Sequence, residues 1–399
     1  MLPLTASVAA LLEGRTARPR RVAVVGGGIL GLGTAWALAR RGHAVTLLEA
    51  GALPDPAASS YDEGRIIRHA YGTMEGYAAM MPAAFAAWRA LFAETGADRL
   101  VPLRAVYALR APSPWEDAVA RTQARQGLGY RLLDDAELDG MAVLDRGPLL
   151  RAVEVDGSGM LRAAPILADL LGLLARLGVV LRAQAPVARF DRGAPVLADG
   201  TRVAAEVTVV AAGAGVLALL PEAAAAAGLR ASLQTLAYLD PPPDLAAAWA
   251  RAPMLLCRLP GHPAGGAYVL PPRDGTRLKL GDYDTSCTVD PAAPRMPLRQ
   301  DRLDALLDAG RQAIARFDAH RVTAARHCLY TMAPEDRFVV APAAPGVILA
   351  SACSGHGFKL APLLGLGLTA LVEERLSVGD AAFWVAGREG EASPPPASA

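Results

Sequence analysis

The 399-residue chain has 40 basic and 39 acidic side chains, which gives a formal net charge of +1. This balance gives no electrostatic reason to expect nucleic acid or an anionic membrane surface as a partner. The length suggests two or three domains, and no apolar run reaches the ~20 residues of a membrane-spanning helix. Four scattered cysteines and six histidines show no metal-ligand spacing, so we expect no metal, no disulfide framework and a cytoplasmic setting.

Residues 21–50 predict one β-α-β unit. The β-branched run 22–25 suits a buried parallel strand, and a glycine-rich turn follows with the spacing G-x-G-x-x-G, at Gly26, Gly28 and Gly31. The first glycine permits a tight turn, the second lets the backbone approach a pyrophosphate, and the third lets helix and strand pack closely.

Glu49 ends the second predicted strand, about 20 residues beyond these glycines, where an acid can accept hydrogen bonds from a ribose. Its charge would repel the 2′-phosphate of NADP. The unit therefore predicts a dinucleotide-binding Rossmann-type domain, with FAD and NAD both open. The alternative is a turn that only packs a helix on a sheet.

A loop rich in proline, serine and glycine then leads into the segment RIIRHAY, which runs from Arg65 through Arg68 to Tyr71. Two arginines three residues apart can bind a phosphate or a carboxylate through their planar guanidinium groups. A pair of surface arginines explains the residues equally well.

Further along, helices are expected over 77–95 and 165–177. A strand is expected over 106–109, and short strands over 187–203 surround a hairpin turn. The apolar strand 207–211 ends in small residues that include Gly213. Small residues suit a strand that a dinucleotide passes closely; a plain buried strand is the alternative.

From residue 229 to about 318 the pattern changes to prolines and alternating strands, with an amphipathic helix expected over 303–317. Lys279 stands between Leu278 and Leu280 in a predicted strand, so it points to the opposite face from them. If the leucines face the core, a solvent-facing lysine is the common case. Otherwise Lys279 is a buried cation that faces a site.

The last block returns to strands over 322–330, 336–340 and 347–350. The turn SGHGFK, from Ser354 to Lys359, opens a helix over 362–374. A glycine-rich turn at the start of a helix directs N–H groups toward an anion.

Several of these segments, in this order, carry a family resemblance: GGGILGLG at 26–33, RIIRHAYG at 65–72, RLKLG at 277–281, HCLYTMAPEDRFVV at 327–340 and SGHGFK at 354–359. They resemble the monomeric sarcosine oxidase and N-methyltryptophan oxidase family, which are FAD-dependent amine oxidases of the D-amino-acid oxidase-like superfamily. The resemblance spans about residues 21–374.

The resemblance implies FAD held covalently through Cys328. It also implies that Arg68 and Lys359 bind the substrate carboxylate, and that Lys279 lies near flavin N5 and promotes the reaction with oxygen. The residues expected at the reaction centre are Lys279, Arg68, Lys359, Tyr268, Tyr330 and Tyr283. Those expected at the cofactor are Gly26, Gly28, Gly31, Glu49, Arg65, Gly213, Cys328, Gly355, His356, Gly357 and Lys359.

Two segments depart from the family pattern. Tyr283 stands where the family's sarcosine oxidases carry a histidine, four residues after the lysine. Residues 61–64 read YDEG, where a histidine-containing stretch similar to Gly-Asp-Thr is expected. Both departures concern the identity of the substrate.

The expected fold is therefore α/β (α+β mixed), with an FAD-binding Rossmann-type domain and a substrate domain built on a mixed or antiparallel sheet. The expected ranges are 19–75, 150–228 and 322–386 for the first domain, 76–149 and 229–321 for the second, and 1–18 and 387–399 for flexible termini.

The expected function is oxidation of a secondary amine that carries a carboxylate, with dioxygen as acceptor and hydrogen peroxide as product. The expected state is monomer or dimer. The alternatives are a D-amino-acid-type dehydrogenase or a deaminating oxidase with non-covalent flavin, and a non-catalytic nucleotide sensor.

Overall fold

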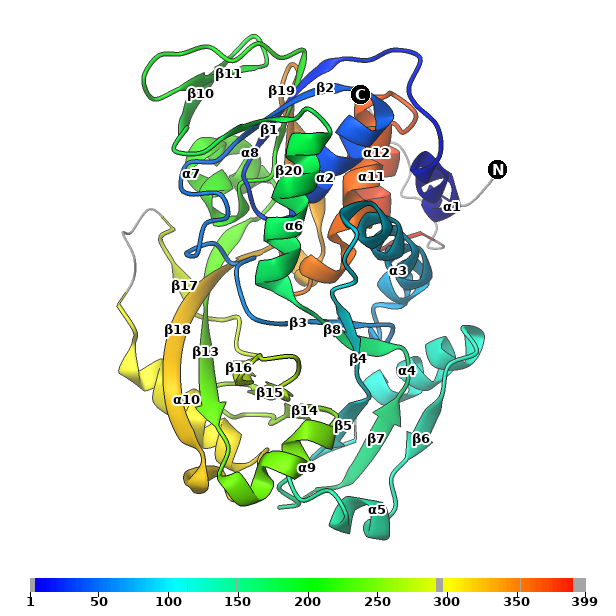
Figure 1. Cartoon of the computed structure of the whole chain (residues 1–399), viewed down its shortest axis with the longest axis vertical. Helices are drawn as coiled ribbons and strands as arrows, with labels where there is room; N and C mark the ends of the chain where they lie inside the picture. Colours follow the sequence, from blue (N-terminus) through cyan, green and yellow to red (C-terminus); the bar gives the residue numbers. More distant parts are fainter. Residues whose placement is uncertain (1–3, 113, 148, 292–296, 352, 390–399) are drawn as a thin grey trace.

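Two large sheets organise the chain in the computed structural model, which describes residues 4–112, 114–147, 149–291, 297–351 and 353–389. In Figure 1 the six-stranded sheet lies in the upper half and the nine-stranded sheet in the lower half. A three-stranded sheet made of β3 (Arg65–Arg68), β8 (Ser158–Leu161) and β4 (Leu100–Pro102) lies between them. This is the mixed α/β architecture that the sequence predicts.

The six-stranded sheet is built around the predicted β-α-β unit. Its order is β19 (Val339–Ala344), β20 (Val347–Ser351), β12 (Val207–Val210), β1 (Arg21–Val25), β2 (Ala44–Leu48) and β9 (Val180–Arg182). Neighbouring strands are parallel except for β19 and β20. Continuous apolar strands suit such a sheet because both of its faces are covered.

Helices cover one face of this sheet: α2 (Ile29–Arg41), α3 (Glu75–Thr95), α6 (Ala163–Arg176) and α11 (Ala361–Val372). The other face carries the hairpin of β10 (Val187–Asp191) and β11 (Ala194–Leu197), with α7 (Val216–Leu219) and α8 (Pro221–Ala226). Helices α2 and α11 meet backbone to backbone, since a Cβ on Gly365 would lie 2.5 Å from the Gly33 oxygen.

The nine-stranded sheet contains β5 (Ala105–Leu109), β6 (Tyr130–Leu132), β7 (Arg151–Val155), β13 (Arg230–Asp240), β14 (Met254–Arg258), β15 (Gly266–Leu270), β16 (Leu278–Asp282), β17 (Thr288–Val289) and β18 (Arg321–Met332). It is mixed, because β14 and β5 are parallel while the other pairs are antiparallel. Helices α9 (Ala246–Arg251) and α10 (Gln300–Arg311) cover one face. The opposite face carries Tyr107, Tyr268 and Cys328, and we call it the site face.

The remaining helices lie at the edges of the two halves. They are α1 (Leu4–Ala9), α4 (Pro114–Arg125), α5 (Asp135–Asp139) and α12 (Val378–Val385). Within the described ranges, no helix has the length and apolarity that a membrane crossing requires. In that same part of the chain, no group of three or more His, Cys, Asp or Glu side chains is arranged to hold a metal ion.

Packing places three segments differently from the expected ranges. The leader is not loose where it is described, because α1 and the turn after it bury Val8 and Leu11 in the core of α2 and α11. Helix α3 joins that same core, and β18 pairs along its whole length with β13 of the large sheet. Sheet and core membership depend on contacts between distant segments, which local patterns do not encode. Of the expected flexible tail, residues 390–399 lie outside the described residues.

Candidate active site

The turn between β1 and α2 leaves no room for side chains at two of its glycines. Gly26 has a φ of +111°, and a Cβ there would lie 2.5 Å from the Ala211 carbonyl oxygen. A Cβ on Gly31 would lie 1.9 Å from the Gly26 oxygen. The backbone of β1, β12 and α2 therefore meets at a point that only glycine allows.

Glu49 is fixed beside this turn by backbone amides. One of its carboxylate oxygens accepts a hydrogen bond from Gly27 N at 2.7 Å, and the other accepts one from Gly51 N at 2.8 Å. The acid at the end of β2 is thus held in one orientation at the edge of a cavity.

This cavity has a volume of about 1030 Å³ and extends from the glycine turn to β18. Eight of the residues expected at the cofactor line it, together with Tyr330: Gly26, Gly28, Glu49, Arg65, Gly213, Cys328, Gly355 and Gly357. Gly31 lies beneath the turn, and the side chains of His356 and Lys359 lie outside the lining.

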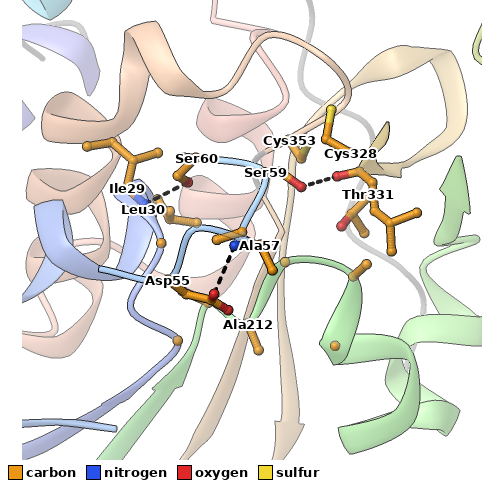
Figure 2. Close-up of a pocket in the computed structure, with 18 of the residues that line it drawn as sticks. Ile29, Leu30, Asp55, Ala57, Ser59, Ser60, Ala212, Cys328, Thr331 and Cys353 are labelled. Carbon is orange, nitrogen blue, oxygen red and sulfur yellow. Dashed lines mark hydrogen bonds between the residues drawn. The ribbon is translucent and has the colours of Figure 1, made fainter. Parts of the chain in front are cut away.

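A loop that includes Ser59 and Ser60 crosses the cavity from α2 to β18 (Figure 2). Ser60 Oγ accepts a hydrogen bond from Ile29 N at 3.0 Å, at the start of α2. Ser59 Oγ donates to the Leu329 carbonyl on β18. The loop therefore connects the two ends of the site.

The lining suits a flavin dinucleotide. A helix start with free N–H groups can receive a pyrophosphate, Glu49 can receive a ribose, and the small residues after β12 let a ligand pass close to the backbone. The volume lies at the upper end for ligand pockets, as a molecule of the size of FAD requires.

Cys328 and Cys353 both line this cavity (Figure 2), and all four cysteines are free. Cys328 lies on β18 and is 4% exposed. Burial raises the pKa of its thiol to about 11, so the group is a protonated thiol at neutral pH.

Lys279 is a buried cation, with 2% of its surface exposed. Leu278 and Leu280 do face the core, under α10, but the opposite face of β16 is the site face and not solvent. The Nζ atom donates to Asp62 Oδ2 at 2.5 Å and to the Gly64 carbonyl at 3.1 Å. Burial lowers the pKa of Lys279 to about 8, although Asp62 acts to raise it.

Two further cations lie beyond the cavity, near the ring of Tyr71. Arg68 is 5.8 Å and Lys359 is 5.5 Å from the ring centroid. Arg68 donates to the Tyr107 hydroxyl at 2.5 Å, and Lys359 donates to the His356 carbonyl at 3.1 Å. In the part of the chain that the structure describes, neither cation has an acidic partner. Burial, followed by the charge of Arg68, keeps the pKa of Lys359 well below its ordinary value.

The tyrosines expected at the reaction centre form a wall on the site face. The ring of Tyr268 occupies the space that a side chain at Gly281 would fill, and it meets Tyr283 edge to face at 5.8 Å. Tyr330 packs on Gly355. Burial raises the pKa of all three hydroxyls, so each is a protonated donor at neutral pH.

His356 supports this wall without facing the cavity. Its ring stacks on Phe338 at 4.3 Å, and burial lowers its pKa to about 3. The neutral ring has one N–H group. Because Nε2 lies 2.8 Å from the Asp336 carbonyl oxygen, it is the donor, and Nδ1 accepts a hydrogen bond from the Tyr71 hydroxyl at 3.2 Å.

Three residues of this region were not expected from the sequence: Asp62, Tyr71 and Tyr107. Asp62 lies in residues 61–64, which depart from the family pattern, so the sequence does point to this part of the site. Tyr71 ends the RIIRHAY segment, but nothing in that segment shows that its ring lies between two cations. Tyr107 lies in a predicted strand about 40 residues from Arg68, a pairing that no local pattern carries.

The fold and the cavity define a dinucleotide-binding protein whose cavity extends from the six-stranded sheet to β18 of the nine-stranded sheet. The family described as FAD dependent oxidoreductase matches residues 21–371, and the chain belongs to that family. FAD is therefore its cofactor, and the protein is a flavin-dependent oxidoreductase.

Curated relatives confirm the resemblance to the sarcosine oxidase and N-methyltryptophan oxidase family. The N-methyl-L-tryptophan oxidase of Salmonella arizonae is 27% identical over 366 residues, which cover 86% of this chain and 91% of that protein. The peroxisomal sarcosine oxidase of Mus musculus is 26% identical over 366 residues, which cover 86% and 89%.

Solved structures share the fold at lower identity. The L-proline dehydrogenase from P. horikoshii superposes with a TM-score of 0.77 at 17% identity, covering 94% of this chain and 99% of that chain. NikD, an unusual amino acid oxidase essential for nikkomycin biosynthesis, gives 0.73 at 21%, covering 90% and 95%.

Proposed function

We propose that the protein oxidises a secondary amine that carries a carboxylate, an N-methyl amino acid or a cyclic imino acid, to an imine. Bound FAD supplies the acceptor for the two electrons that leave the amine. The amine loses two electrons and two protons, and dioxygen takes up both, so hydrogen peroxide balances the reaction. The names of the two curated relatives, an N-methyl-L-tryptophan oxidase and a sarcosine oxidase, support this substrate class.

The observation that carries the proposal is a pair of neighbouring cations, the half-buried Arg68 and the buried Lys359, which lack acidic partners in the described residues. Burying unpaired charges costs free energy unless an anion completes the site. A substrate carboxylate supplies that anion, and the guanidinium fork of Arg68 can bind it through two hydrogen bonds. Anchoring the carboxylate fixes the adjacent C–H bond in direction and so removes orientational freedom before the reaction.

Lys279 supplies positive charge on the site face of β16. Reduction of dioxygen develops negative charge, and a fixed cation in a site that excludes water stabilises such charge. We assign this part to Lys279 because its ammonium group lies over the Tyr268 ring, 5.5 Å from the centroid.

The test compares amines that differ only in the carboxylate. Under anaerobic conditions, N-methyl amino acids and cyclic imino acids should bleach the yellow colour, whereas the same amines without the carboxylate should bleach it at least about tenfold more slowly. Equal rates for both sets would contradict the proposal.

We also propose that Cys328 holds FAD through a thioether. The bond forms with loss of the thiol proton and of one methyl hydrogen, and dioxygen accepts the two electrons released. After acid precipitation the yellow colour should stay in the pellet, and it should move to the supernatant in Cys328→Ala but not in Cys353→Ala. Colour in the supernatant of the unmodified protein would mean non-covalent FAD.

A second candidate is a D-amino-acid-type dehydrogenase, or a deaminating oxidase, with non-covalent flavin. One observation favours this candidate: the negative charge of Asp62 offsets the positive charge of Lys279. Oxygen consumption during turnover separates the dehydrogenase from the oxidase, because the dehydrogenase would need an added electron acceptor. Release of ammonia, instead of a primary amine or a cyclic imine, would identify the deaminating oxidase.

A further inference from the structure

A carboxylate in the segment that departs from the family pattern, residues 61–64, lies against the amine of Lys279. Asp62 Oδ2 is 2.5 Å from Lys279 Nζ and 3.2 Å from Arg65. Its other oxygen accepts hydrogen bonds from the Tyr238 hydroxyl at 2.6 Å and from Glu63 N at 2.7 Å. Both oxygens are therefore satisfied, and the Asp62 side chain is fully buried.

The surroundings of Lys279 contain one acid and several other titratable groups. They are Asp62 from the loop before β3, Arg65 from β3, Tyr238 from β13, Tyr268 from β15 and Cys328 from β18. Burial keeps the tyrosine and cysteine groups neutral, since it raises their pKa values. Asp62 is thus the group in this set that can balance a positive charge on Lys279.

We infer that Asp62 is a positioning residue for Lys279, which fixes the ammonium group in one place on the site face and keeps it protonated. The inference rests on the proposed function, in which that charge serves the reaction with dioxygen.

The electrostatics of the pair give the direction of the effect. Although burial acts to raise the pKa of Asp62, Lys279 and Arg65 hold it below its ordinary value, so the carboxylate is charged at neutral pH. The pKa of Lys279 is about 8 with this partner present. Without the carboxylate, Arg65 becomes the nearest charge and repels the ammonium, so Lys279 loses its proton at a lower pH.

The position of the Lys279 ammonium group also depends on Asp62. Lys279 Nζ has two acceptors, Asp62 Oδ2 and Gly64 O, and both belong to the same four-residue segment. Loss of the carboxylate leaves one carbonyl to hold a long and flexible side chain.

The test measures the pH dependence of the oxygen reaction without any amine. The holoenzyme is reduced with dithionite and mixed with oxygenated buffer, and the return of the yellow colour is followed. In the unmodified protein the rate should fall above about pH 8. In Asp62→Asn this fall should move at least one pH unit lower, which makes the rate at pH 7.5 at least about threefold slower. The matched control is Glu63→Gln, because Glu63 pairs with Arg277 and not with Lys279; its profile should match the unmodified protein.

An unchanged pH profile in Asp62→Asn, or a faster rate at every pH, would overturn the inference. Because dithionite replaces the amine, a wrong substrate class does not affect this result. If the unmodified protein itself returns to yellow slowly and without pH dependence, the oxidase proposal fails, and the inferred role of the charge fails with it.

A second measurement uses the oxidised holoenzyme without any amine, so that it is independent of turnover. Thermal unfolding of the unmodified protein, Asp62→Asn, Lys279→Met and the double variant forms a double-mutant cycle. The double variant removes both charges and should lose clearly less stability than the sum of the single losses. Additive losses would show that the two residues do not act as a pair.

Discussion

At the scale of single residues, the arrangement of charge explains more of this site than its shape does. Arg68, Lys279 and Lys359 are all withdrawn from bulk solvent, but they differ in their partners. Lys279 has a carboxylate at hydrogen-bond distance, whereas Arg68 and Lys359 face a tyrosine ring. The charge of Lys279 is thus balanced within the protein, whereas Arg68 and Lys359 are arranged to receive an anion from outside.

We expect Arg68→Ala to raise the apparent Kd for carboxylate substrates about 10- to 100-fold, because a charge-assisted hydrogen bond contributes about 1.5–3 kcal/mol. Anaerobic titration of the flavin absorbance measures this Kd. The control is Arg104→Ala, because Arg104 pairs with Glu154 and is 56% exposed. An unchanged Kd in Arg68→Ala would remove Arg68 from the substrate site.

We expect Lys279→Met to slow the reaction of the reduced enzyme with oxygen by about 100-fold or more, the usual effect of losing a group that stabilises developing charge. Reduction by the amine should change far less, since the charge acts only on dioxygen. Stopped-flow measurement of both half-reactions tests this difference. Equal losses in the two half-reactions would assign Lys279 a structural role.

From the sequence alone, Lys279 could face either solvent or a site. The alternation with Leu278 and Leu280 gave its direction relative to the leucines, but the choice required knowing what covers the second face of the sheet. Asp62 shows the same limit. Its segment was marked as unusual, yet its partner is more than 200 residues away on β16, and only tertiary packing brings them together.

At the scale of elements, the β1–α2 turn combines a strained backbone with close packing. We expect Gly26→Ala to lower the free energy of unfolding by more than about 3 kcal/mol, because the new Cβ meets backbone atoms that cannot move. It should also reduce FAD binding. Denaturant unfolding and FAD retention on a desalting column measure the two effects.

The matched control for this prediction is Gly96→Ala at the end of α3. Gly96 also has a positive φ, of +78°, but a Cβ there meets nothing within 4 Å. It should cost only about 1–2 kcal/mol, the steric cost of a left-handed backbone. Equal losses at the two positions would show that close packing at Gly26 adds nothing.

Elements with a strong local pattern could be predicted closely. The expected strand at 45–48 and the expected helix at 165–177 correspond to β2 and α6. The helix expected over 303–317 is α10, which starts at Gln300 and ends at Arg311. Phe317 lies in a separate turn, and its ring fills the space above Gly310. The apolar spacing therefore continues past Arg311, where the helix ends.

At the scale of the whole molecule, buried ion pairs make stability depend on pH. Glu373 lies 2.9 Å from Arg41 and 3.3 Å from His43. Although burial acts to raise the pKa of Glu373, the hydrogen bond and charge of Arg41 hold it below its ordinary value. A lowered pKa means that the unfolded chain binds the proton more tightly. The stabilisation is therefore present above about pH 4.3 and is lost as the pH falls.

We expect Glu373→Gln to cost about 3 kcal/mol at pH 7, because it leaves Arg41 without its buried partner. The variant should also lose less further stability than the unmodified protein between pH 5 and pH 3. Glu374→Gln is the control, since the neighbouring Glu374 is 70% exposed and its replacement should leave stability almost unchanged. Calorimetry across this pH range tests both, and the same acid sensitivity in Glu373→Gln would contradict the assignment.

The strand order of the six-stranded sheet also has a consequence for biosynthesis. Strand β1 is made first, yet its neighbour β12 pairs with β20, and α2 packs on α11, both of which come near the end of the described chain. During translation the glycine turn therefore leaves the ribosome long before the surfaces that cover it. The lining of the nucleotide cavity is complete only when residues up to Phe358 have emerged, so we expect FAD to bind after elongation has passed that point.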